Sequence, residues 1–374
     1  MEGYHAKGIF IMKLALHVGQ VTQPIPGGIG RYTKSLIKAL PKDEVTLYTF
    51  ACADPPVDAP PRYKKISRLN YRLEYSIWHR FRSRDVDCEG DLLHAPSLAV
   101  PPAKSRPLVV TVHDIAFLRH PGAFSRRGVH FHTRGLALAR KEAAAIIVPS
   151  RFTHDELVRE GVDPALIHVI PHGIDIEPDI DTTHDADIVT SLGVPSRFVL
   201  AVGTLEPRKN LPMLVRAVDS LRNKGEDLAL VLVGPRGWGE VKGLDHDFVY
   251  EVGRVSDEIL NALMRQAIVY CVPSIYEGFG MPALEAMSRN TAVIAAGVAS
   301  LPEVVGDAGV LLDPLDSAVW ASAIERMSSD EEYRKAQAQR GLVRAKSFTW
   351  DSSARAHVAA YREALRHWRT QVRS

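Results

Sequence analysis

The sequence predicts an α/β protein with two facing Rossmann-like domains, each built on a parallel sheet, and a cleft between them. The chain of 374 residues is longer than a single hydrophobic core usually allows, so two domains are expected. Short apolar or β-branched runs alternate with longer helical patterns, and this alternation occurs twice along the chain. These observations favour two domains of the same architecture.

Each half contains six runs that we expect to form strands. In the first half they cover residues 13–18, 45–50, 91–97, 108–114, 144–150 and 167–173. In the second half they cover residues 198–204, 228–234, 248–254, 267–274, 292–297 and 309–313. Many of these runs are almost continuously apolar, which is typical of parallel strands buried on both faces.

The predicted domains are an N-terminal domain over residues 1–180 and a C-terminal domain over residues 181–350. Residues 174–197 are acidic, contain prolines and show little apolar periodicity, so we interpret them as the interdomain linker. Residues 351–374 have a helical pattern, and we expect this helix to pack back on the N-terminal domain. Residues 1–11 are interpreted as an extension before the first strand.

Composition is that of a soluble globular protein, because 46% of the residues are hydrophobic and 24% are charged. The formal net charge of +2 is too small to indicate a nucleic-acid binder. The three cysteines are far apart and form no CxxC pair, so we expect a reducing cytoplasm, no disulfide framework and no metal site. We see no secretory signal and no apolar run long enough to span a bilayer, so any membrane contact should be peripheral.

The stretch "PSIYEGFGMPALEAMSRN" predicts a strand-to-helix turn that could bind an anion. Pro282 suits the first helical position and Asn290 suits a left-handed helix end, so we expect a helix from about 281 to 289. The N-terminus of that helix has unpaired N–H groups, and Gly278 and Gly280 let a ligand approach the backbone.

Glu277 and Glu285 bracket the expected anion site. A carboxylate would repel a phosphate, so these two side chains more reasonably accept hydrogen bonds from hydroxyl groups. A ligand with both phosphate and polyol parts, such as a nucleotide sugar, meets both requirements. The alternative is an ordinary turn in which Glu285 favours the helix N-terminus and Glu277 is solvated.

Two cations and a histidine are expected at the same cleft. Arg208 and Lys209 follow the first strand of the second half, where ligands of open α/β sheets collect, and could neutralise a diphosphate without a metal. His113 ends an apolar strand at the mouth of the crevice. The alternatives are two solvated cations and a structural histidine. His172 is interpreted as a linker or supporting residue.

The run from Glu277 to Glu285 resembles the E-x7-E signature of the retaining glycosyltransferases of family four, which have the B-type glycosyltransferase (GT-B) fold. The segments "VIPHGID", "AVGTLEPRKNLPMLVRA" and "SLPEVVGDAGVLLDP" are similar to family segments in the same order. The likeness extends from Met12 onward and is weakest over residues 54–91 and in the final helix. "EGFGMPALEAM" followed by "SLPEVVGDA" is most similar to bacterial mannosyltransferases of polysaccharide and lipopolysaccharide assembly.

The resemblance implies transfer of a hexosyl group with retention of configuration, without a metal or other cofactor. The implied donor is GDP-mannose, with UDP-, ADP- and dTDP-sugars as alternatives, and the implied acceptor is a glycan or lipid-linked glycan. A nucleotide-sugar epimerase and a non-catalytic nucleotide-sugar binder are the alternatives from other classes. An inverting enzyme of the same fold remains an alternative only if the resemblance of this loop to the retaining family is misleading.

The resemblance also implies roles for individual residues. Glu277 would bind the sugar hydroxyls, Glu285 the ribose, and His113 would orient the sugar near the reacting centre. The loop around Gly30 would approach the diphosphate and the acceptor side of the cleft. The implied catalytic residues are His113, Arg208, Lys209 and Glu277. The implied donor-binding residues are Gly27, Gly28, Gly203, Arg208, Lys209, Val255, Glu277, Gly278, Phe279, Gly280, Met281 and Glu285.

Residues 62–84 predict a basic amphipathic helix. Ile66, Leu69, Leu73, Ile77 and Phe81 are spaced to share one helical face. Such a helix could lie on the anionic inner face of the cytoplasmic membrane. Alternatively, its apolar face could pack on the sheet of its own domain. Nucleic acid is a third option that nothing else in the chain supports.

Overall fold

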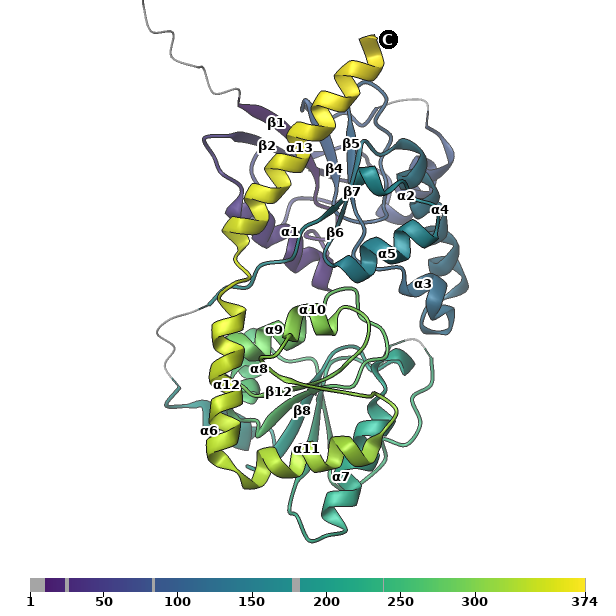
Figure 1. Ribbon diagram of the computed structural model, residues 1–374. Coiled ribbons are helices and arrows are strands. Elements are labelled where there is room, and N and C mark those ends of the chain that lie inside the picture. Colours follow the sequence, from purple (N-terminus) through teal and green to yellow (C-terminus); the bar gives the residue numbers. More distant parts are fainter. Residues whose placement is uncertain (1–10, 24–26, 83–84, 177–181, 238, 374) are drawn as a thin grey trace, which may run out of the picture.

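The computed structural model describes residues 11–23, 27–82, 85–176, 182–237 and 239–373. Two α/β bodies lie one above the other, and the last helix runs from the lower body onto the upper one (Figure 1). The proposed N-terminal extension, except its last residue, and residues 177–181 of the proposed linker lie outside the described residues.

The first half forms a parallel sheet in the order β3-β2-β1-β4-β5-β6-β7 within the described ranges. Its strands are β1 Met12–His17, β2 Val45–Ala51, β3 Tyr63–Lys65, β4 Leu92–Ala95, β5 Leu108–Thr111, β6 Ala145–Val148 and β7 Ile167–Val169. In register, Leu14 of β1 lies opposite Leu47 of β2 and Leu92 of β4. The short strand β3 was not predicted.

The second half forms a parallel sheet in the order β10-β9-β8-β11-β12-β13, again counting only described residues. Its strands are β8 Phe198–Val202, β9 Ala229–Val233, β10 Val249–Gly253, β11 Val269–Val272, β12 Val293–Ala296 and β13 Val310–Leu312. All the strands predicted in both halves are confirmed, and so is the fold of two parallel α/β sheets.

Helices cover both sheets. The first half contains α1 Gly27–Ala39, α2 Tyr71–Arg80, α3 Ala116–Arg119, α4 Arg126–Glu142 and α5 Arg151–Arg159, with 3-10 turns at Pro121–Ala123 and Pro164–Leu166. The second half contains α6 Asp185–Ser191, α7 Leu211–Arg222, α8 Asp257–Gln266, α9 Met281–Ser288, α10 Leu301–Val305, α11 Ser317–Ser329 and α12 Glu331–Ala345, with a 3-10 turn at Pro207–Lys209. Several starts are fixed by side-chain caps, as where Ser150 accepts a hydrogen bond from the Thr153 N–H.

The last helix, α13 Trp350–Arg373, belongs to the core of the first half. Its buried residues Val358 and Tyr361 lie in the same apolar cluster as Leu14 and Leu16 of β1. Ala15 faces the other side of the sheet and joins a second cluster, as the alternation of side chains along a strand requires. The final helix therefore covers one face of the first sheet.

The chain crosses between the halves twice at one place. The Ile174 N–H donates a hydrogen bond of 2.9 Å to the Phe348 carbonyl where the two passes meet. Gly173 is required here, because a Cβ atom would overlap the backbone nitrogen of Trp350. The passage into the second half and the return from it are thus packed against each other.

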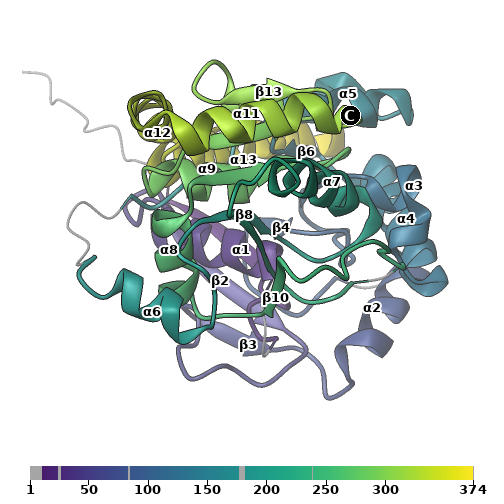
Figure 2. The ribbon, with the colours of Figure 1, turned by 90° about the horizontal axis from the view of Figure 1, so that it is seen from below.

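The proposed linker contains a helix that the sequence analysis missed. Helix α6 lies beside α8 (Figure 2), and Asp185 forms a two-pronged ion pair with Arg265 at 2.5 and 2.7 Å. Asp185 is buried, so the pair anchors α6 to the second half. The low apolar periodicity of this stretch gave no sign of the helix, because its anchor is a charge pair between distant residues.

The proposed basic helix over residues 62–84 is also corrected. Only Tyr71–Arg80 is helical, residues 63–65 form β3, and residues 83–84 lie outside the described residues. The buried face of α2 is formed by Tyr75, Trp78 and His79, whereas the leucines expected on an apolar face are exposed. Aromatic packing therefore decides which face of α2 is buried.

No helix in the described part of the chain combines the length and the apolar character needed to cross a bilayer.

Candidate active site

The order of the strands places the candidate site. The order in which the chain adds strands reverses between β1 and β4 in the first sheet, and between β8 and β11 in the second. In open α/β sheets, ligands bind beyond the carboxyl ends of the strands at such a switch point. Helix α1 follows β1, Arg208 follows β8 and Glu277 follows β11. The predicted cleft residues therefore collect at the switch points of the two sheets.

Helix α9 begins where the sequence places it. Gly280 precedes it with φ 98°, a left-handed conformation that favours glycine, and Pro282 lies in its first turn. A Cβ atom on Gly280 would also lie only 2.8 Å from Leu301 Cδ2. Asn290 closes the helix with φ 57°. This geometry presents the N–H groups of Gly280 and Met281 at a helix N-terminus, which favours an anion.

A compact charge cluster lies next to that helix. Lys209 Nζ lies 2.5 Å from Glu277 Oε1, and Arg208 Nη1 lies 3.1 Å from Glu277 Oε2. Arg208 Nε lies 2.6 Å from Glu206 Oε1. All four side chains are at most 15% exposed, so water screens these charges weakly. The two cations are thus already matched by two carboxylates, and the sequence analysis did not identify Glu206.

The two glutamates of the signature have opposite pKa shifts. Burial favours the neutral acid at Glu277, but the charges of Lys209 and Arg208 outweigh it and lower the pKa to about 2. At Glu285 burial prevails, and its pKa is raised despite the nearby charges of Arg31 and Arg289. Glu277 is therefore a fixed anion, whereas the charge of Glu285 depends on its neighbours.

Gly203 gives Lys209 its position. Gly203 directly follows β8 with φ 146°, and a Cβ atom there would lie 3.2 Å from Lys209 Cε. The lysine side chain therefore lies over the bare backbone of Gly203 on its way to Glu277. The predicted residues Gly203 and Glu277 are thus both in contact with Lys209.

An arginine from the first half reaches Glu285. Arg31 Nη1 lies 3.3 Å from Glu285 Oε1, and Arg31 Nη2 lies 2.6 Å from Asp257 Oδ1. Arg31 lies one turn after Gly27 in α1 and reaches residues of the second half. The sequence analysis noted the glycines of this loop and missed Arg31, although a cation directly after Gly30 was a usable signal.

The halves also meet at the carbonyl of Gly278. Ser150 Oγ and Thr153 Oγ1 donate hydrogen bonds to that carbonyl at 2.7 and 3.2 Å. A Cβ atom on Gly278 would overlap the His113 carbonyl oxygen, so glycine is required for this contact. In addition, the carboxylate of Glu303 accepts hydrogen bonds from the Arg151 and Phe152 N–H groups, which open α5.

His113 is half-buried, and both of its ring nitrogens have protein partners. Nε2 lies 3.0 Å from the Pro96 carbonyl, and Nδ1 lies 3.3 Å from His172 Nε2. Burial lowers the pKa of His113, although the Pro96 carbonyl and Asp114 act in the opposite direction. The structure thus brings His113 to the contact with Gly278 and pairs it with His172.

The remaining predicted residues border this region. Gly27, with φ 61°, and Gly28 open α1, and a Cβ atom on either would meet nothing within 4 Å, so a ligand has room to approach. Val255 follows β10, an edge strand two positions from β8 in the sheet. Phe279 is buried and faces the ring of His172, with centroids 5.0 Å apart. Phe279 therefore contributes packing beside its backbone groups.

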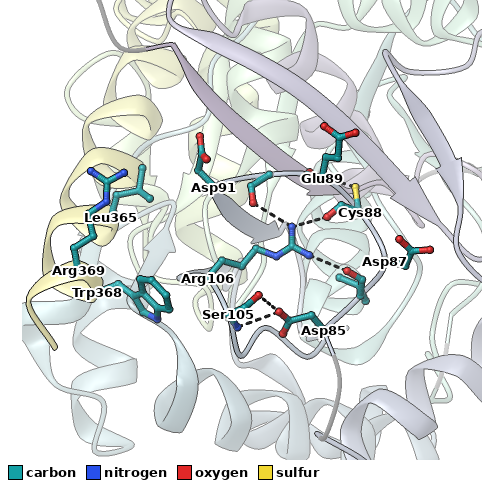
Figure 3. A pocket seen from close by; sticks show the side chains of 12 residues that line it. Asp85, Asp87, Cys88, Glu89, Asp91, Ser105, Arg106, Leu365, Trp368 and Arg369 are labelled. Atoms are coloured by element: carbon teal, nitrogen blue, oxygen red, sulfur yellow. Dashed lines mark hydrogen bonds between the residues drawn. The ribbon is translucent and has the colours of Figure 1, made fainter. Parts of the chain in front are cut away.

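A pocket of about 560 Å³ lies away from the candidate site, where the loops before β4 and β5 meet the end of α13 (Figure 3). At its centre, Arg106 donates hydrogen bonds to the carbonyls of Val86, Cys88 and Gly90. Asp85 accepts hydrogen bonds from the N–H groups of Lys104 and Ser105. These contacts hold the loop before β4 in place, so we assign the pocket a structural role.

The fold and the site define a two-domain GT-B protein, and comparisons with known proteins agree. Residues 26–178 match the profile of Glycosyltransferase Family 4, and residues 189–343 match that of Glycosyl transferases group 1. O-antigen chain mannosyltransferase B of Escherichia coli is 29% identical over 382 residues, covering 94% of this chain and 100% of that protein. MMP alpha-(1->4)-mannosyltransferase of Mycolicibacterium hassiacum is 31% identical over 287 residues, covering 69% and 66%.

A solved structure shows the same fold. Anabaena Alr3699/HepE in complex with UDP-glucose superposes with a TM-score of 0.69 and 21% identity, covering 93% of this chain and 98% of that one. The protein belongs to the glycosyltransferases of group 1 and family 4. The resemblance inferred from the sequence is thereby confirmed at the level of the family and the fold.

Proposed function

We propose that the protein is a retaining glycosyltransferase that moves mannose from GDP-mannose to a glycan or lipid-linked glycan acceptor in cell-surface polysaccharide synthesis. The observation that carries this proposal is the cluster of Lys209, Arg208 and Glu277 beside the N-terminus of α9. It combines cations and helix N–H groups for a diphosphate with a fixed carboxylate for sugar hydroxyls. Mannose is favoured because two relatives of the chain are mannosyltransferases.

In the proposed reaction, the bond between the anomeric carbon and the diphosphate oxygen breaks while the acceptor oxygen bonds to that carbon from the same face. The departing phosphate takes the acceptor's proton. Lys209, Arg208 and the N-terminus of α9 stabilise the charge that grows on the phosphate. Glu277 holds the sugar hydroxyls, and Glu285 holds the ribose. No metal is assigned to this reaction.

The ion pairs of the cluster impose a condition on donor binding. Arg208 and Lys209 are neutralised by Glu206 and Glu277, so a diphosphate must share the two cations with these carboxylates. Unlike these two cations, the N-terminus of α9 is not paired with Glu277, so its positive potential remains for the diphosphate. We therefore assign the helix N-terminus a larger share of phosphate binding than the sequence suggested.

A nucleotide-binding screen tests the donor. Thermal shift and calorimetry with GDP, UDP, ADP and dTDP, and then with their sugar derivatives, are measured on metal-free protein. Stabilisation by GDP and GDP-mannose supports the proposal, whereas selective UDP or dTDP binding overturns the mannose assignment and keeps the transferase. Binding of none of the nucleotides contradicts the donor site.

Single-residue variants test which side chains take part in the transfer. We expect Lys209→Ala and Glu285→Ala to reduce transfer by about 100-fold or more, the usual loss for one group that stabilises charge in the transition state. Lys242→Ala is the control, because the Lys242 side chain is 77% exposed and pairs with the exposed Glu240. Full activity in either site variant contradicts the assignment of these residues.

We also propose that the exposed side of α2 lies on an anionic membrane. Leu73 on α2 is 48% exposed, and Leu69 and Phe81, which flank the helix, are 41% and 59% exposed. The exposed cations Arg72 and Arg80 lie on the helix itself. Helix α2 lies at the periphery of the first half, beside α4 (Figures 1 and 2). Exposed apolar residues flanked by arginines are suited to the interface of an anionic bilayer.

Vesicle flotation tests this surface. The protein should float with phosphatidylglycerol vesicles and remain unbound with phosphatidylcholine vesicles. Leu73→Ser and Arg72→Glu should weaken flotation, whereas Val343→Ser, a change at an exposed apolar residue of α12, should not. Equal flotation of all the variants contradicts the proposal.

A further inference from the structure

The hydrogen bonds of His113 determine which ring nitrogen carries its proton. A carbonyl oxygen only accepts hydrogen bonds, so the 3.0 Å contact with the Pro96 carbonyl requires a proton on His113 Nε2. In the neutral ring, Nδ1 then has a lone pair and accepts. Its partner at 3.3 Å, His172 Nε2, must therefore donate.

The environment of His172 agrees with this assignment. With a proton on Nε2, its Nδ1 atom is unprotonated, and Nδ1 has no hydrogen-bond partner among the described residues. The opposite tautomer would instead leave a buried N–H donor without an acceptor while two lone pairs faced each other. Burial and the neighbouring histidines keep the pKa of His172 well below its usual range, so the neutral ring is retained.

A buried network fixes the rings around this pair. His357 Nδ1 donates to the Ser353 carbonyl at 2.7 Å, so its Nε2 accepts from the Tyr32 hydroxyl at 2.7 Å. The Tyr32 ring lies edge-on to His113, with centroids 4.9 Å apart, and 4.8 Å from His172. Helix α13 thus holds Tyr32 against both histidines, and the pair has little freedom to rotate.

His113 lies where the two halves touch, since its carbonyl packs against Gly278 of the loop that precedes α9. We propose that His172 is a positioning residue that holds His113 as the Nε2–H tautomer, so that His113 acts as a hydrogen-bond donor at the cleft and not as a general base. A ligand hydroxyl would share or replace the Pro96 carbonyl as acceptor. The role toward a sugar hydroxyl rests on the proposed function, whereas the tautomer does not.

Imidazole ¹⁵N NMR of the full chain tests the tautomer directly, with His113→Asn used to assign the signal of His113. We expect a neutral His113 ring with an unprotonated Nδ1 and a protonated Nε2. In His172→Leu, Nδ1 loses its donor, and the signal should shift toward a mixture of tautomers. His172→Gln retains an N–H donor of similar reach and should keep the wild-type pattern. An Nδ1–H ring in the wild type overturns the proposal, and so does an unchanged signal in His172→Leu.

Kinetics test the consequence for transfer. His172→Leu should lower kcat by about tenfold, the value of one neutral hydrogen bond, with a smaller effect on the KM for the donor. His172→Gln should recover most of the loss. Thr49→Val removes a hydrogen bond from a buried residue of β2 to the Pro61 carbonyl, outside this network, and it controls for general destabilisation. Equal kcat in the Leu and Gln variants contradicts the positioning role. Failure of nucleotide binding would instead overturn the proposed function and leave the NMR result intact.

Discussion

Arg31 and Glu285 connect the two halves of the molecule through an ion pair in which Arg31 Nη1 lies 3.3 Å from Glu285 Oε1. Asp257 binds the other end of the same guanidinium. The pair lies where a nucleotide is proposed to bind, so it couples the charge of Glu285 to the contact between the halves.

This coupling predicts opposite pH effects for two variants. Arg31 lowers the pKa of Glu285 and Asp257 raises it, while burial sets the overall upward shift. Arg31→Ala should therefore move the acid limb of the kcat/KM profile to higher pH, because the proposed role of Glu285, accepting hydrogen bonds from ribose hydroxyls, requires its carboxylate form. Asp257→Ala should move that limb to lower pH. Profiles from pH 4.5 to 8 that shift in the same direction would contradict the coupling.

Glu277 should contribute to stability in a defined pH range. Its pKa in the folded protein is about 2, below the ordinary value of 4.5, because the charges of Lys209 and Arg208 outweigh burial. A lowered pKa contributes stability that is present above pH 4.5 and is lost as the pH falls from 4.5 toward 2. Glu277→Gln should thus cost up to about 3 kcal/mol of unfolding free energy at pH 7, and less at pH 3.

Urea unfolding of the wild type and Glu277→Gln at pH 3, 5 and 7 measures this difference. Glu240→Gln changes an exposed carboxylate and should show no comparable loss. A difference that is constant across the pH range would mean that the cost comes from packing and not from the ion pairs.

Gly278→Ala should separate the halves without unfolding them. A Cβ atom at this position overlaps the His113 carbonyl oxygen, which is backbone and cannot move aside like a flexible side chain. Transfer should fall by about 100-fold, since small misplacements of reacting groups have effects of that size. Small-angle scattering should report a larger radius of gyration. Gly122→Ala is the matched control, because a Cβ atom there would meet nothing within 4 Å.

Buried histidines should make the protein sensitive to mild acid. Burial lowers the pKa of His17 to about 3 and that of His357 to about 4, and keeps those of His94 and His172 well below 6.5. The unfolded chain therefore binds more protons below pH 6.5, so stability is present above that pH and falls as the pH decreases. Each such histidine contributes a slope of about 1.4 kcal/mol per pH unit.

Denaturant unfolding between pH 5 and 8 measures that slope. His357→Gln removes one titrating group and should reduce the slope by the amount for one proton, about 1.4 kcal/mol per pH unit. His184→Gln alters a histidine that is 78% exposed and should leave the slope unchanged. An unchanged slope in His357→Gln would show that this histidine does not contribute.

The fold was predictable because the strands are marked by local composition. The short apolar runs of β1, β5, β8 and β11 are typical of parallel strands buried on both faces, and few other structures suit them. Helix α6 was missed because an ion pair between Asp185 and Arg265 anchors it, and no local pattern encodes a pair so far apart in the sequence. In α2, apolar spacing selected the leucines, whereas the bulkier Tyr75 and Trp78 fill the core.

The candidate site was predictable where its residues lie in one motif. Glu277, Gly280 and Glu285 lie within a single loop and helix, so their spacing already indicates a shared ligand. Arg31 and Glu206 were missed because their importance depends on charges contributed by other segments. The pairing of His113 with His172 likewise appears only when β5 and β7 have been folded into one sheet.

The close crossing at Gly173 and Trp350 has a mechanical consequence. Because the two connections between the halves are packed against each other at this point, we expect the halves to rotate about it more readily than to move apart. Residues near this pivot, such as His172, should travel little during a swing, whereas the distant rim should sweep a wide arc. A pivot at this point would keep the groups near it in register while the rim opens.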